Sequence, residues 1–388
     1  MRLHLILPQV KPGDFSFPSQ CPYADCKARN FKFLQPVIKP LRDSVYSKVI
    51  AHRYRCLSCG RTFRVYPKGV NRGQISLRVK GLAIMLYLLG LSYGAVSIAL
   101  EALGIYMSKG SVYGAVQDAA KRVPGLKREE VFQGIKTPAL GADVTSVKCK
   151  GKWLPLGISV DETSGIVLTL DNLSGEDTQS LKEWIEPIAK EVEAEVIVTD
   201  DADAFKQVAD ELGLNHQVCK KHVERNTEAL IESLKPQVKE DKDGSLEEIK
   251  VSPEQAIADL DRLGELVRER RPEDEGEIGE LYRRYLAARP PGKGEKASLA
   301  YRLKLFFLDR WNLWRRLTFY RKWRGRGGEK LDGTNNAAER AIGWWIKERY
   351  RMMRGYKREE SAVNLSRLMC WAGNHLNCGG ADLSLLMA

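Results

Sequence analysis

Four of the eight cysteines in this 388-residue chain fall into two closely spaced pairs. Cys21 and Cys26 belong to "CPYADC", and Cys56 and Cys59 belong to "CLSCG" further along the chain. Two such pairs, each on a tight turn, can supply the four thiolates of a tetrahedral Zn²⁺ site. Four unrelated buried cysteines are the alternative interpretation. Because four protein ligands leave no open position on the metal, we expect a structural zinc rather than a catalytic one.

The sequence around these cysteines predicts a small β domain. The segment "HRYRCLSCGRTFRVY" has the strand, turn and strand pattern typical of a zinc ribbon. We therefore predict a zinc ribbon over residues 1–72.

A pair of short helices is predicted in the next segment, residues 73–128. Ser92 and Ser108 could each cap a helix, and Gly104 falls in the turn between them. These are the proportions of a helix-turn-helix DNA-binding domain, although an ordinary helical hairpin would share the pattern. In the first interpretation, the exposed start of the recognition helix carries Lys109, Ser111 and Tyr113.

The charge balance indicates a polyanionic partner. Lys and Arg total 62 against 50 Asp and Glu, a formal net charge of +12. Nucleic acid is the first candidate for such a surplus, and an anionic membrane surface is the second. The N-terminal apolar run is very short and prolines interrupt it, so no secretory signal is expected. The most apolar stretch, "GLAIMLYLLGLSYGAVSIALEAL", indicates two packed helices rather than a membrane span. We expect reduced cysteines and a cytoplasmic location.

Residues 135–227 predict an α/β core in the order strand, strand, strand, helix, strand, helix, strand. The continuously apolar "AEVIV" before "TDD" is typical of a strand that is buried on both faces. Asp143 lies within the first strand of this pattern, and Asp200 ends the fourth. Acids at such positions of an α/β sheet can converge at one rim.

A third acid is predicted on a helix near the C-terminus. The segment "TNNAAERAI" predicts a helix that opens after Asn335 and Asn336, with Glu339 in its first turn. Carboxylates that hold two divalent cations serve phosphodiester cleavage, because one ion activates the attacking oxygen and the other stabilises the leaving oxygen. Hard oxygen ligands suit Mg²⁺ or Mn²⁺. We predict that two such ions are held by Asp143, Asp200 and Glu339.

The same helix carries cations that are spaced to share one neighbouring face and could hold a DNA backbone. These side chains are Arg340, Lys347, Arg351 and Arg354.

The second acid has an alternative. The segment "VTDDADAFK" also offers Asp201, but Asp200 is favoured because it directly follows the apolar strand. Asp161 and Asp171, at the ends of the second and third strands, are expected to begin turns.

A helical insertion is predicted over residues 228–328, before residues 329–388 return to the core with the final Glu. Phe307, Trp311 and Trp314 follow helical spacing and are expected to form its core. Trp323, in a run of arginines and lysines, is a candidate for stacking on an unpaired base, with plain packing as the alternative.

Three short segments carry a resemblance to a known family. With the order Asp143, Asp200, Glu339, the chain resembles the DDE transposases of bacterial and archaeal insertion sequences. "CKKH", with Cys219 and His222, resembles the Cys-x-x-His of Mutator-like and hAT-like transposases and their prokaryotic relatives. "TNNAAERAI" resembles the segment that carries the final Glu in several insertion-sequence groups, and "VTDDADAFK" resembles the segment around the second Asp. The chain departs from the family at position 201, where Asp replaces the usual Gly.

The resemblance implies a fold and an activity. The fold is an α/β ribonuclease-H-like core with an all-α insertion, preceded by a small zinc ribbon and a helix-turn-helix domain. The activity is metal-dependent DNA cleavage at terminal inverted repeats, followed by transfer of the freed 3′-hydroxyl to target DNA. His222 is then expected near the scissile phosphate, where it could bind the phosphate or assist proton transfer.

The resemblance further implies a homodimer or higher homo-oligomer on double-stranded DNA, associated with a prokaryotic nucleoid and with no membrane partner. Two alternatives stay open at this point. One is a non-catalytic or domesticated DNA-binding relative, and the other is a ribonuclease-H-like nuclease or resolvase that cuts without joining.

Overall fold

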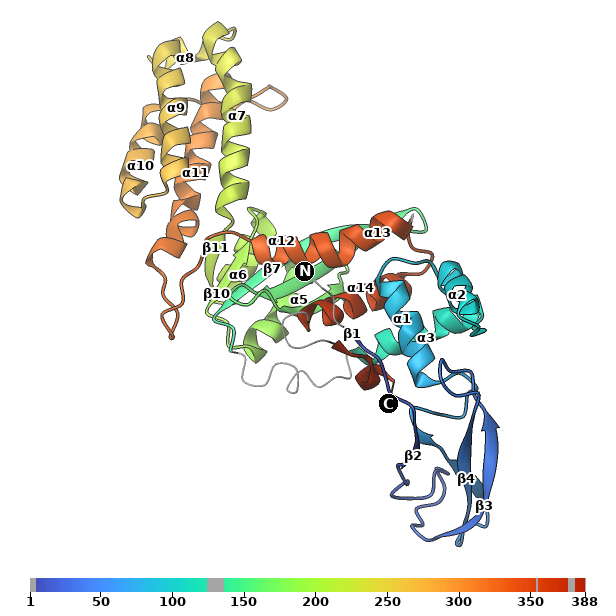
Figure 1. Cartoon of the computed structure of the whole chain (residues 1–388). Coiled ribbons are helices and arrows are strands. Elements are labelled where there is room, and N and C mark those ends of the chain that lie inside the picture. Colours follow the sequence, from blue (N-terminus) through green and yellow to red (C-terminus); the bar gives the residue numbers. More distant parts are fainter. Residues whose placement is uncertain (1–4, 124–135, 354, 376–380, 388) are drawn as a thin grey trace. The chain divides into compact units, whose positions relative to one another are not determined.

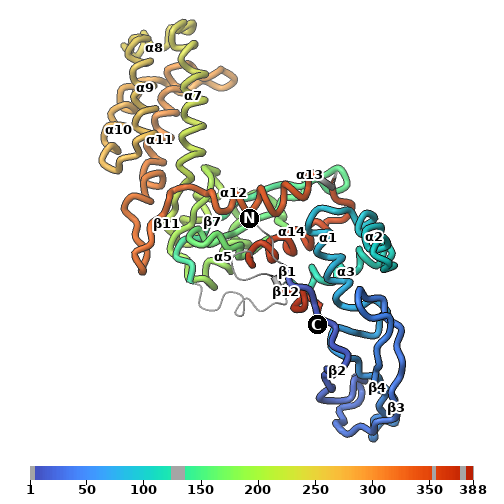
Figure 2. The backbone as a smooth tube through the Cα atoms, viewed as in Figure 1, coloured from blue at the N-terminus to red at the C-terminus, as the bar shows by residue number. Residues whose placement is uncertain are grey.

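The structure, a computed structural model of the whole chain, describes residues 5–123, 136–353, 355–375 and 381–387. The chain forms two compact units, and neither is a single stretch of sequence. The first unit consists of Met1–Gly134, Val147–Leu154 and Gly343–Ala388, and the second consists of Ile135–Ser146 and Pro155–Ile342. Figures 1 and 2 identify the elements by label and by sequence colour. The five domain ranges predicted from the sequence remain predictions.

A five-stranded mixed sheet in the order β11-β10-β7-β8-β9 organises the second unit. Strand β10 runs parallel to β7 and β11, whereas β8 and β9 are antiparallel. Every residue of β10 is buried, as its continuously apolar sequence predicted. The strands are β7 (Ala139–Cys149), β8 (Lys152–Asp161), β9 (Val167–Asn172), β10 (Val196–Thr199) and β11 (Asn215–Val218).

Two helices complete the predicted element order and confirm the mixed α/β class. They are α5 (Thr178–Glu191), between β9 and β10, and α6 (Asp203–Glu211), between β10 and β11. Asp177 caps α5, since its carboxylate accepts a hydrogen bond from the Ser180 backbone N–H at 3.1 Å.

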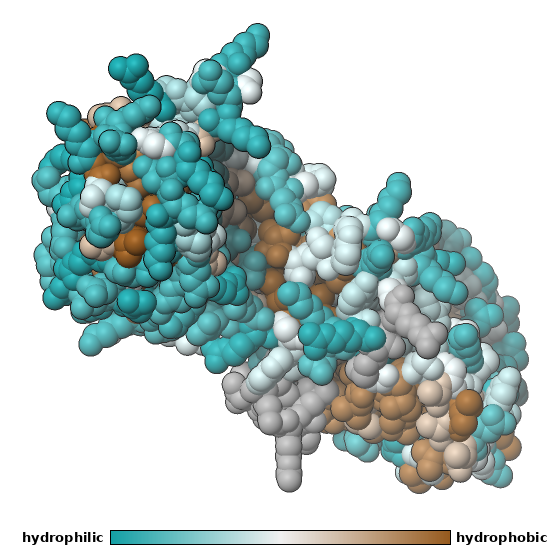
Figure 3. Space-filling model, turned by 90° about the horizontal axis from the view of Figure 1, so that it is seen from above, coloured by the Kyte–Doolittle hydropathy of each residue, from teal (hydrophilic) through white to brown (hydrophobic). Residues whose placement is uncertain are grey.

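A bundle of helices follows β11 within the second unit. Its own apolar core fully buries Phe307 and Trp314, and Trp311 packs against it, as their helical spacing predicted. The outer face of the bundle seen in Figure 3 is mainly hydrophilic. The elements are α7 (Lys220–Glu240), α8 (Ser245–Glu248), α9 (Pro253–Glu269), η2 (Pro272–Asp274), α10 (Glu275–Arg284) and α11 (Leu299–Lys322).

The predicted acid-bearing helix is present and changes its winding along its length. It begins as α12 (Asn336–Ala341), continues as a π-helical segment, η3 (Ile342–Lys347), and ends as α13 (Glu348–Met353). A π-helix has wider turns than an α-helix, and such segments are frequent at functional sites.

The first unit contains a three-stranded antiparallel sheet of β3 (Phe31–Pro40), β4 (Lys48–Cys56) and β5 (Thr62–Val65). Two short pairs join β2 (Lys11–Phe15) to β6 (Pro67–Lys68) and β1 (Leu5–Ile6) to β12 (Ala381–Asp382). The helices of this unit outside α13 are α1 (Leu77–Leu88), α2 (Tyr93–Ala102), α3 (Lys109–Arg122), α14 (Glu359–Asn374) and η4 (Leu383–Leu386).

The predicted caps of the α2–α3 pair are confirmed. The Ser92 hydroxyl accepts a hydrogen bond from the Ala95 N–H at 3.1 Å, and the Ser108 hydroxyl accepts one from the Ser111 N–H at 3.2 Å. Gly104 adopts φ +75° in the turn, which a residue with a side chain rarely does. Among the described residues, no helix combines the length and the apolar composition that crossing a bilayer requires.

Candidate active site

Asp143 and Asp200 reach the same rim of the sheet from adjacent strands. In the parallel pair β7–β10, Gly141 lies opposite Val198. Asp143 and Asp200 each stand two residues beyond this pair, so both follow the same pleat towards the same edge. Asp143 accepts a hydrogen bond from the Val144 N–H at 2.8 Å, and Asp200 accepts one from the Ala202 N–H at 3.1 Å. The two acids are therefore neighbours in space.

The electrostatics of Asp143 show that a third acid is near. The pKa of Asp143 is raised to about 6, chiefly by burial and in smaller part by the negative charges of Asp200 and Glu339, while the Val144 N–H and His222 act to lower it. Like charges raise the pKa of a carboxyl only when they lie close to it. The charges of Asp200 and Glu339 therefore both act on Asp143, and a bound cation would offset their mutual repulsion.

Asn335 ties the start of the Glu339 helix to this rim. Its side-chain amide donates to the Ala142 carbonyl at 3.1 Å, and its backbone N–H donates to the Cys219 sulfur at 3.4 Å. Asn335 is fully buried. One turn later, the Glu339 N–H donates to the Asn335 carbonyl at 3.1 Å, which places Glu339 in the first turn of α12, as predicted. The hydrogen bond with the Ala142 carbonyl brings Asn335, and with it the start of α12, beside the residue that precedes Asp143.

Glu339 lies next to His222, at the start of α7. The His222 Nδ1 is 3.5 Å from a Glu339 oxygen, and the Glu339 side chain is 42% exposed. Ligand atoms of Cys219, His222 and Glu339 all lie within 4.8 Å of one another. The hydrogen bond with Cys219 raises the pKa of His222, and the nearby Glu339 raises it too.

Glu339 and His222 line a cavity of about 330 Å³ in the second unit. Its other lining residues are mixed in charge and are Lys221, Glu224, Arg225 and Glu228. The acid therefore faces open space rather than the protein interior.

The choice between Asp200 and Asp201 gains a structural argument. Asp201 is engaged elsewhere, with one oxygen 2.8 Å from the Lys206 ammonium and the other 3.9 Å from the buried Arg310 guanidinium. A carboxylate that neutralises two cations is poorly placed to hold a metal ion as well. Asp161 accepts hydrogen bonds from the Thr163 N–H and the Ser164 hydroxyl, so it begins a turn, as expected.

Glu162 is a partly buried acid in the same region that the sequence analysis missed. Its side chain lies over Gly141, where a Cβ would collide with it. One carboxyl oxygen is buried and has no hydrogen-bond partner among the described residues. Burial raises the pKa of Glu162 to about 8. The only sequence signal was a second acid directly after Asp161.

Replacing Glu162 by Gln is expected to flatten the dependence of stability on pH. The folded protein keeps the Glu162 proton up to about pH 8, whereas the unfolded chain loses it near the ordinary value of 4.5, so stability falls as pH rises between these values. Melting temperatures of both proteins should be measured from about pH 5 to pH 9. They should be similar near pH 5, and the variant should melt at a higher temperature than the parent near pH 9. The exposed Glu176→Gln serves as the control and should follow the parent. Parallel curves for Glu162→Gln and the parent would show that Glu162 is not held neutral.

The predicted basic face of the acid-bearing helix needs a correction. Its spacing assumed a continuous α-helix, but the π-helical segment lies between Arg340 and Lys347. Because π turns hold more residues, these two side chains do not share a face by α-helical spacing. Arg340, Lys347 and Arg351 are each exposed. Arg354 lies outside the described residues.

The prediction that Trp323 stacks on a base is wrong in this structure. Trp323 is 8% exposed and packs with Ala139, Val196 and Val198 from β7 and β10. The alternative, plain packing, is confirmed, because the small and branched side chains of the two strands leave room for an indole there.

The three candidates on α3 differ in exposure. Lys109 and Ser111 are exposed, as predicted. Tyr113 is partly buried, its hydroxyl lies 3.3 Å from the Ser361 hydroxyl, and its ring meets Tyr93 edge to face. Tyr113 therefore packs against Tyr93 and Ser361 and does not lie on a free face of α3.

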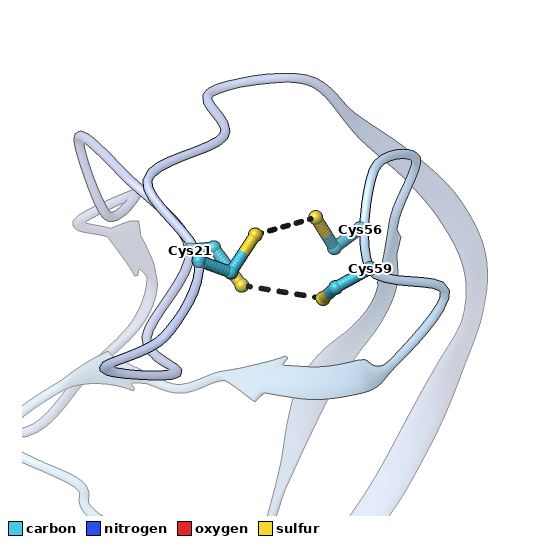
Figure 4. Close-up of side chains that lie close together, drawn as sticks. Cys21, Cys56 and Cys59 are labelled. Carbon is cyan, nitrogen blue, oxygen red and sulfur yellow. Dashed lines mark hydrogen bonds between the residues drawn. The ribbon is translucent and has the colours of Figure 1, made fainter.

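The four predicted zinc ligands come together in the first unit, and Figure 4 labels three of them, Cys21, Cys56 and Cys59. The sulfur of Cys21 is 3.8 Å from that of Cys59, and the sulfur of Cys26 is 3.8 Å from that of Cys56. Thiolates about 2.3 Å from one tetrahedral Zn²⁺ would stand about 3.8 Å apart, whereas a disulfide needs about 2 Å. A hydrogen bond from Arg61 lowers the pKa of Cys59 to about 6, which favours its thiolate, whereas burial raises the pKa of Cys21. The cluster fits zinc.

Comparison with solved structures gives weak likenesses, of which two are an integrase core domain and a transposase complex. No family model and no curated protein matches the chain. The HTLV-2 integrase catalytic core domain in complex with magnesium is 23% identical, over 26% of this chain and 72% of that one, with a TM-score of 0.19. The Drosophila P element transposase strand transfer complex is 12% identical, over 80% of this chain and 83% of that one, with a TM-score of 0.27. With TM-scores this low, we base the function on the geometry of the site.

Proposed function

We propose that the protein is a metal-dependent DDE transposase that cleaves and joins DNA strands. The observation that carries this proposal is that Asp143 and Asp200 are neighbours at one rim of the sheet, where the helix that carries Glu339 also begins. Asp143 and Asp200 each follow the paired residues Gly141 and Val198 by two positions on adjacent strands. The Asn335 side chain joins the start of the Glu339 helix to Ala142 by a hydrogen bond. A ribonuclease-H-like assignment of the core and an insertion-sequence origin belong to the same proposal.

The acids fit Mg²⁺ or Mn²⁺ by their chemistry. Asp143, Asp200 and Glu339 offer only hard oxygen ligands, and the raised pKa of Asp143 reflects its burial first and then the nearby charges of Asp200 and Glu339. When bound, a pair of such ions supplies Lewis-acid activation of the attacking oxygen and stabilisation of the leaving oxygen.

The chain's own residues would orient the DNA at this rim. His222, at 3.5 Å from Glu339, could bind the scissile phosphate or hold a proton near it. Lys221 and Arg225 line the cavity onto which Glu339 opens and supply positive charge for a DNA strand.

The first unit would recognise the DNA. A zinc ribbon around the four cysteines and a helix-turn-helix of α2 and α3 are the proposed readers of the terminal inverted repeats. The net charge of +12 supports binding to the backbone. Since two DNA ends must meet, the active form is proposed to be a homodimer or larger, acting on terminal repeats and target DNA.

The proposal is tested with labelled DNA that carries the sequences flanking the coding region. Strand cleavage should require Mg²⁺ or Mn²⁺ and stop with EDTA. Glu339→Gln should lower the cleavage rate by about 10²-fold or more, because it removes one anionic metal ligand, while DNA affinity stays close to that of the parent. The neighbouring Glu348→Gln, also on this helix, is the matched control and should cleave normally.

The products separate the proposal from its rivals. Joined strands in a target plasmid support a transposase, whereas cleavage without joining indicates a nuclease or resolvase. Full cleavage by Glu339→Gln would remove Glu339 from the site, and binding without any cleavage indicates a DNA-binding protein only.

A further inference from the structure

A second cavity, of about 510 Å³, lies wholly within the first unit. Its size is that of a small-ligand pocket. Residues from the starts of α2 and α3 and from the segment before α14 line it. Its cations are Lys109, Arg349, Lys357 and Arg358, and none of the described residues that line it is Asp or Glu. The cavity therefore favours an anion.

Helix dipoles add to this positive charge. Ser92, the N-cap of α2, and Lys109, the first residue of α3, both line the cavity, as does Arg358, the N-cap of α14. Backbone N–H groups at a helix start attract anions. No side chain caps α14, so its first N–H groups lack that acceptor. Glu359 and Glu360, in the first turn of α14, are exposed and are not among the residues that line the cavity.

Arg349 supplies an independent sign of a missing ligand. It is 2% exposed and donates to the Gly90 carbonyl at 2.9 Å and the Leu91 carbonyl at 3.2 Å. Its Nε has no hydrogen-bond partner among the described residues, which also offer it no ion pair. The Tyr87 ring lies 4.4 Å from the Arg349 guanidinium but carries no formal charge, so an anion in the cavity that Arg349 lines would still compensate a buried charge.

The remaining wall of the cavity is aromatic. Tyr87 and Tyr93 stack with ring centroids 4.3 Å apart and planes within 6°, and the Tyr93 ring meets Tyr113 at 5.4 Å. Tyr356 also lines the cavity. Flat aromatic surfaces beside cations are how proteins hold an unpaired base together with its phosphate.

We infer that this pocket binds one nucleotide, with its phosphate on the cations and helix starts and its base on Tyr93 and Tyr113, which are partly exposed, whereas Tyr87 and Tyr356 are buried behind them. The inference rests on the proposed function in taking DNA as the source of the nucleotide. A free nucleotide presents the same chemistry and is distinguished below. Lys109 and Tyr113 would thus contact one unpaired nucleotide, in addition to any contact of α3 with duplex DNA.

The test uses the full-length protein without Mg²⁺, so that cleavage plays no part. The charge reversal K109E/K357E changes two exposed side chains of the pocket. The matched control, K293E/K296E, makes the same charge change on two exposed side chains of the loop before α11. Affinity for a 5′-phosphorylated single strand, measured by anisotropy, should fall about tenfold or more for the pocket variant, with a salt slope smaller by about one to two. The control should bind like the parent.

Photocrosslinking locates the base. A single strand that contains 5-bromodeoxyuridine should crosslink to Tyr93 or Tyr113, and the crosslink should weaken in Tyr93→Leu and persist in Tyr93→Phe, which keeps the ring. Competition by a deoxynucleoside monophosphate would show that a free nucleotide also fits, whereas a lack of competition would assign the pocket to a strand.

Three outcomes would overturn the inference. They are an equal loss of affinity in the two double variants, crosslinks confined to other segments, and an abasic strand that binds as tightly as the base-bearing one. Failure of the proposed function looks different. In that case Asp143→Asn would cleave normally, or the parent would not cleave at all, while the binding and crosslinking results could still support the pocket.

Discussion

Replacing Asp143 by asparagine is expected to lower Mg²⁺-dependent strand cleavage by about 10³-fold or more, since several kcal/mol of metal-assisted transition-state stabilisation would be lost. Asparagine keeps the size of the side chain and its hydrogen bond with the Val144 N–H, so folding should be preserved. The substitution removes the negative charge of Asp143, which neighbours Asp200 on the adjacent strand. Single-turnover cleavage of labelled DNA measures the effect, and anisotropy should show unchanged DNA affinity.

The neighbouring acids provide the matched comparison. Asp200→Asn should be as inactive as Asp143→Asn. Asp201→Asn should cleave but melt at a lower temperature, because it removes one of the two carboxylates that each of Arg310 and Lys206 contacts. The reverse result would make Asp201 the second acid, and normal cleavage by Asp143→Asn would end the assignment of this rim as an active site.

The raised pKa of Asp143, about 6, adds a dependence on pH. A carboxyl whose pKa is raised keeps its proton to higher pH, and the protonated form cannot hold a cation. Mg²⁺ affinity and cleavage should therefore increase as the pH rises through about 6, and saturate above it. Apparent Mg²⁺ affinity that is constant from about pH 5 to pH 7 would show that Asp143 is already ionised, or is not a ligand.

Loss of one cysteine from the four-sulfur cluster is the second large effect. Cys56→Ser should abolish stoichiometric zinc binding and unfold the small sheet of β3, β4 and β5, because binding of a structural zinc is worth about 10–16 kcal/mol to such a domain. Released zinc, measured with a colorimetric chelator, should fall from about one ion per chain to none. Proteolysis should then cut within this sheet.

Cys149→Ser is the control for this experiment. Cys149 is also buried in the first unit but does not belong to the cluster, so its variant should keep the zinc. Full zinc content in Cys56→Ser would contradict the four-thiolate site. A further comparison is between DNA affinity and cleavage. Cys56→Ser should lower the affinity for DNA more than it lowers the single-turnover cleavage rate of DNA already bound.

Local sequence was sufficient to predict those features that depend on interactions between residues close together in the chain. The serine caps of α2 and α3, the buried strand β10 and the paired cysteines each depend on neighbours within a few residues, so each could be predicted. The stacking role of Trp323 failed for the opposite reason. Its cationic sequence neighbours suggested an exposed ring, but packing on Ala139 and Val198 buries it.

The acid-bearing helix shows the same limit. Its cations were placed by α-helical periodicity, and the π-helical segment, which nothing in the spacing signalled, breaks that periodicity. Glu162 was missed because only the fold brings its carboxyl over Gly141.

The sequence by itself determined the alternation of strands and helices and the four-cysteine set, because hydrophobic period, turn chemistry and cysteine spacing are properties of short segments. Only the tertiary structure decided that Asp143 and Asp200 are neighbours and that the Glu339 helix begins at the same rim, through the parallel register of β7 and β10 and the hydrogen bond from Asn335 to Ala142. It also decided that four cations and four tyrosines line one pocket. Such meetings depend on contacts between residues far apart in the chain, and no local pattern encodes them.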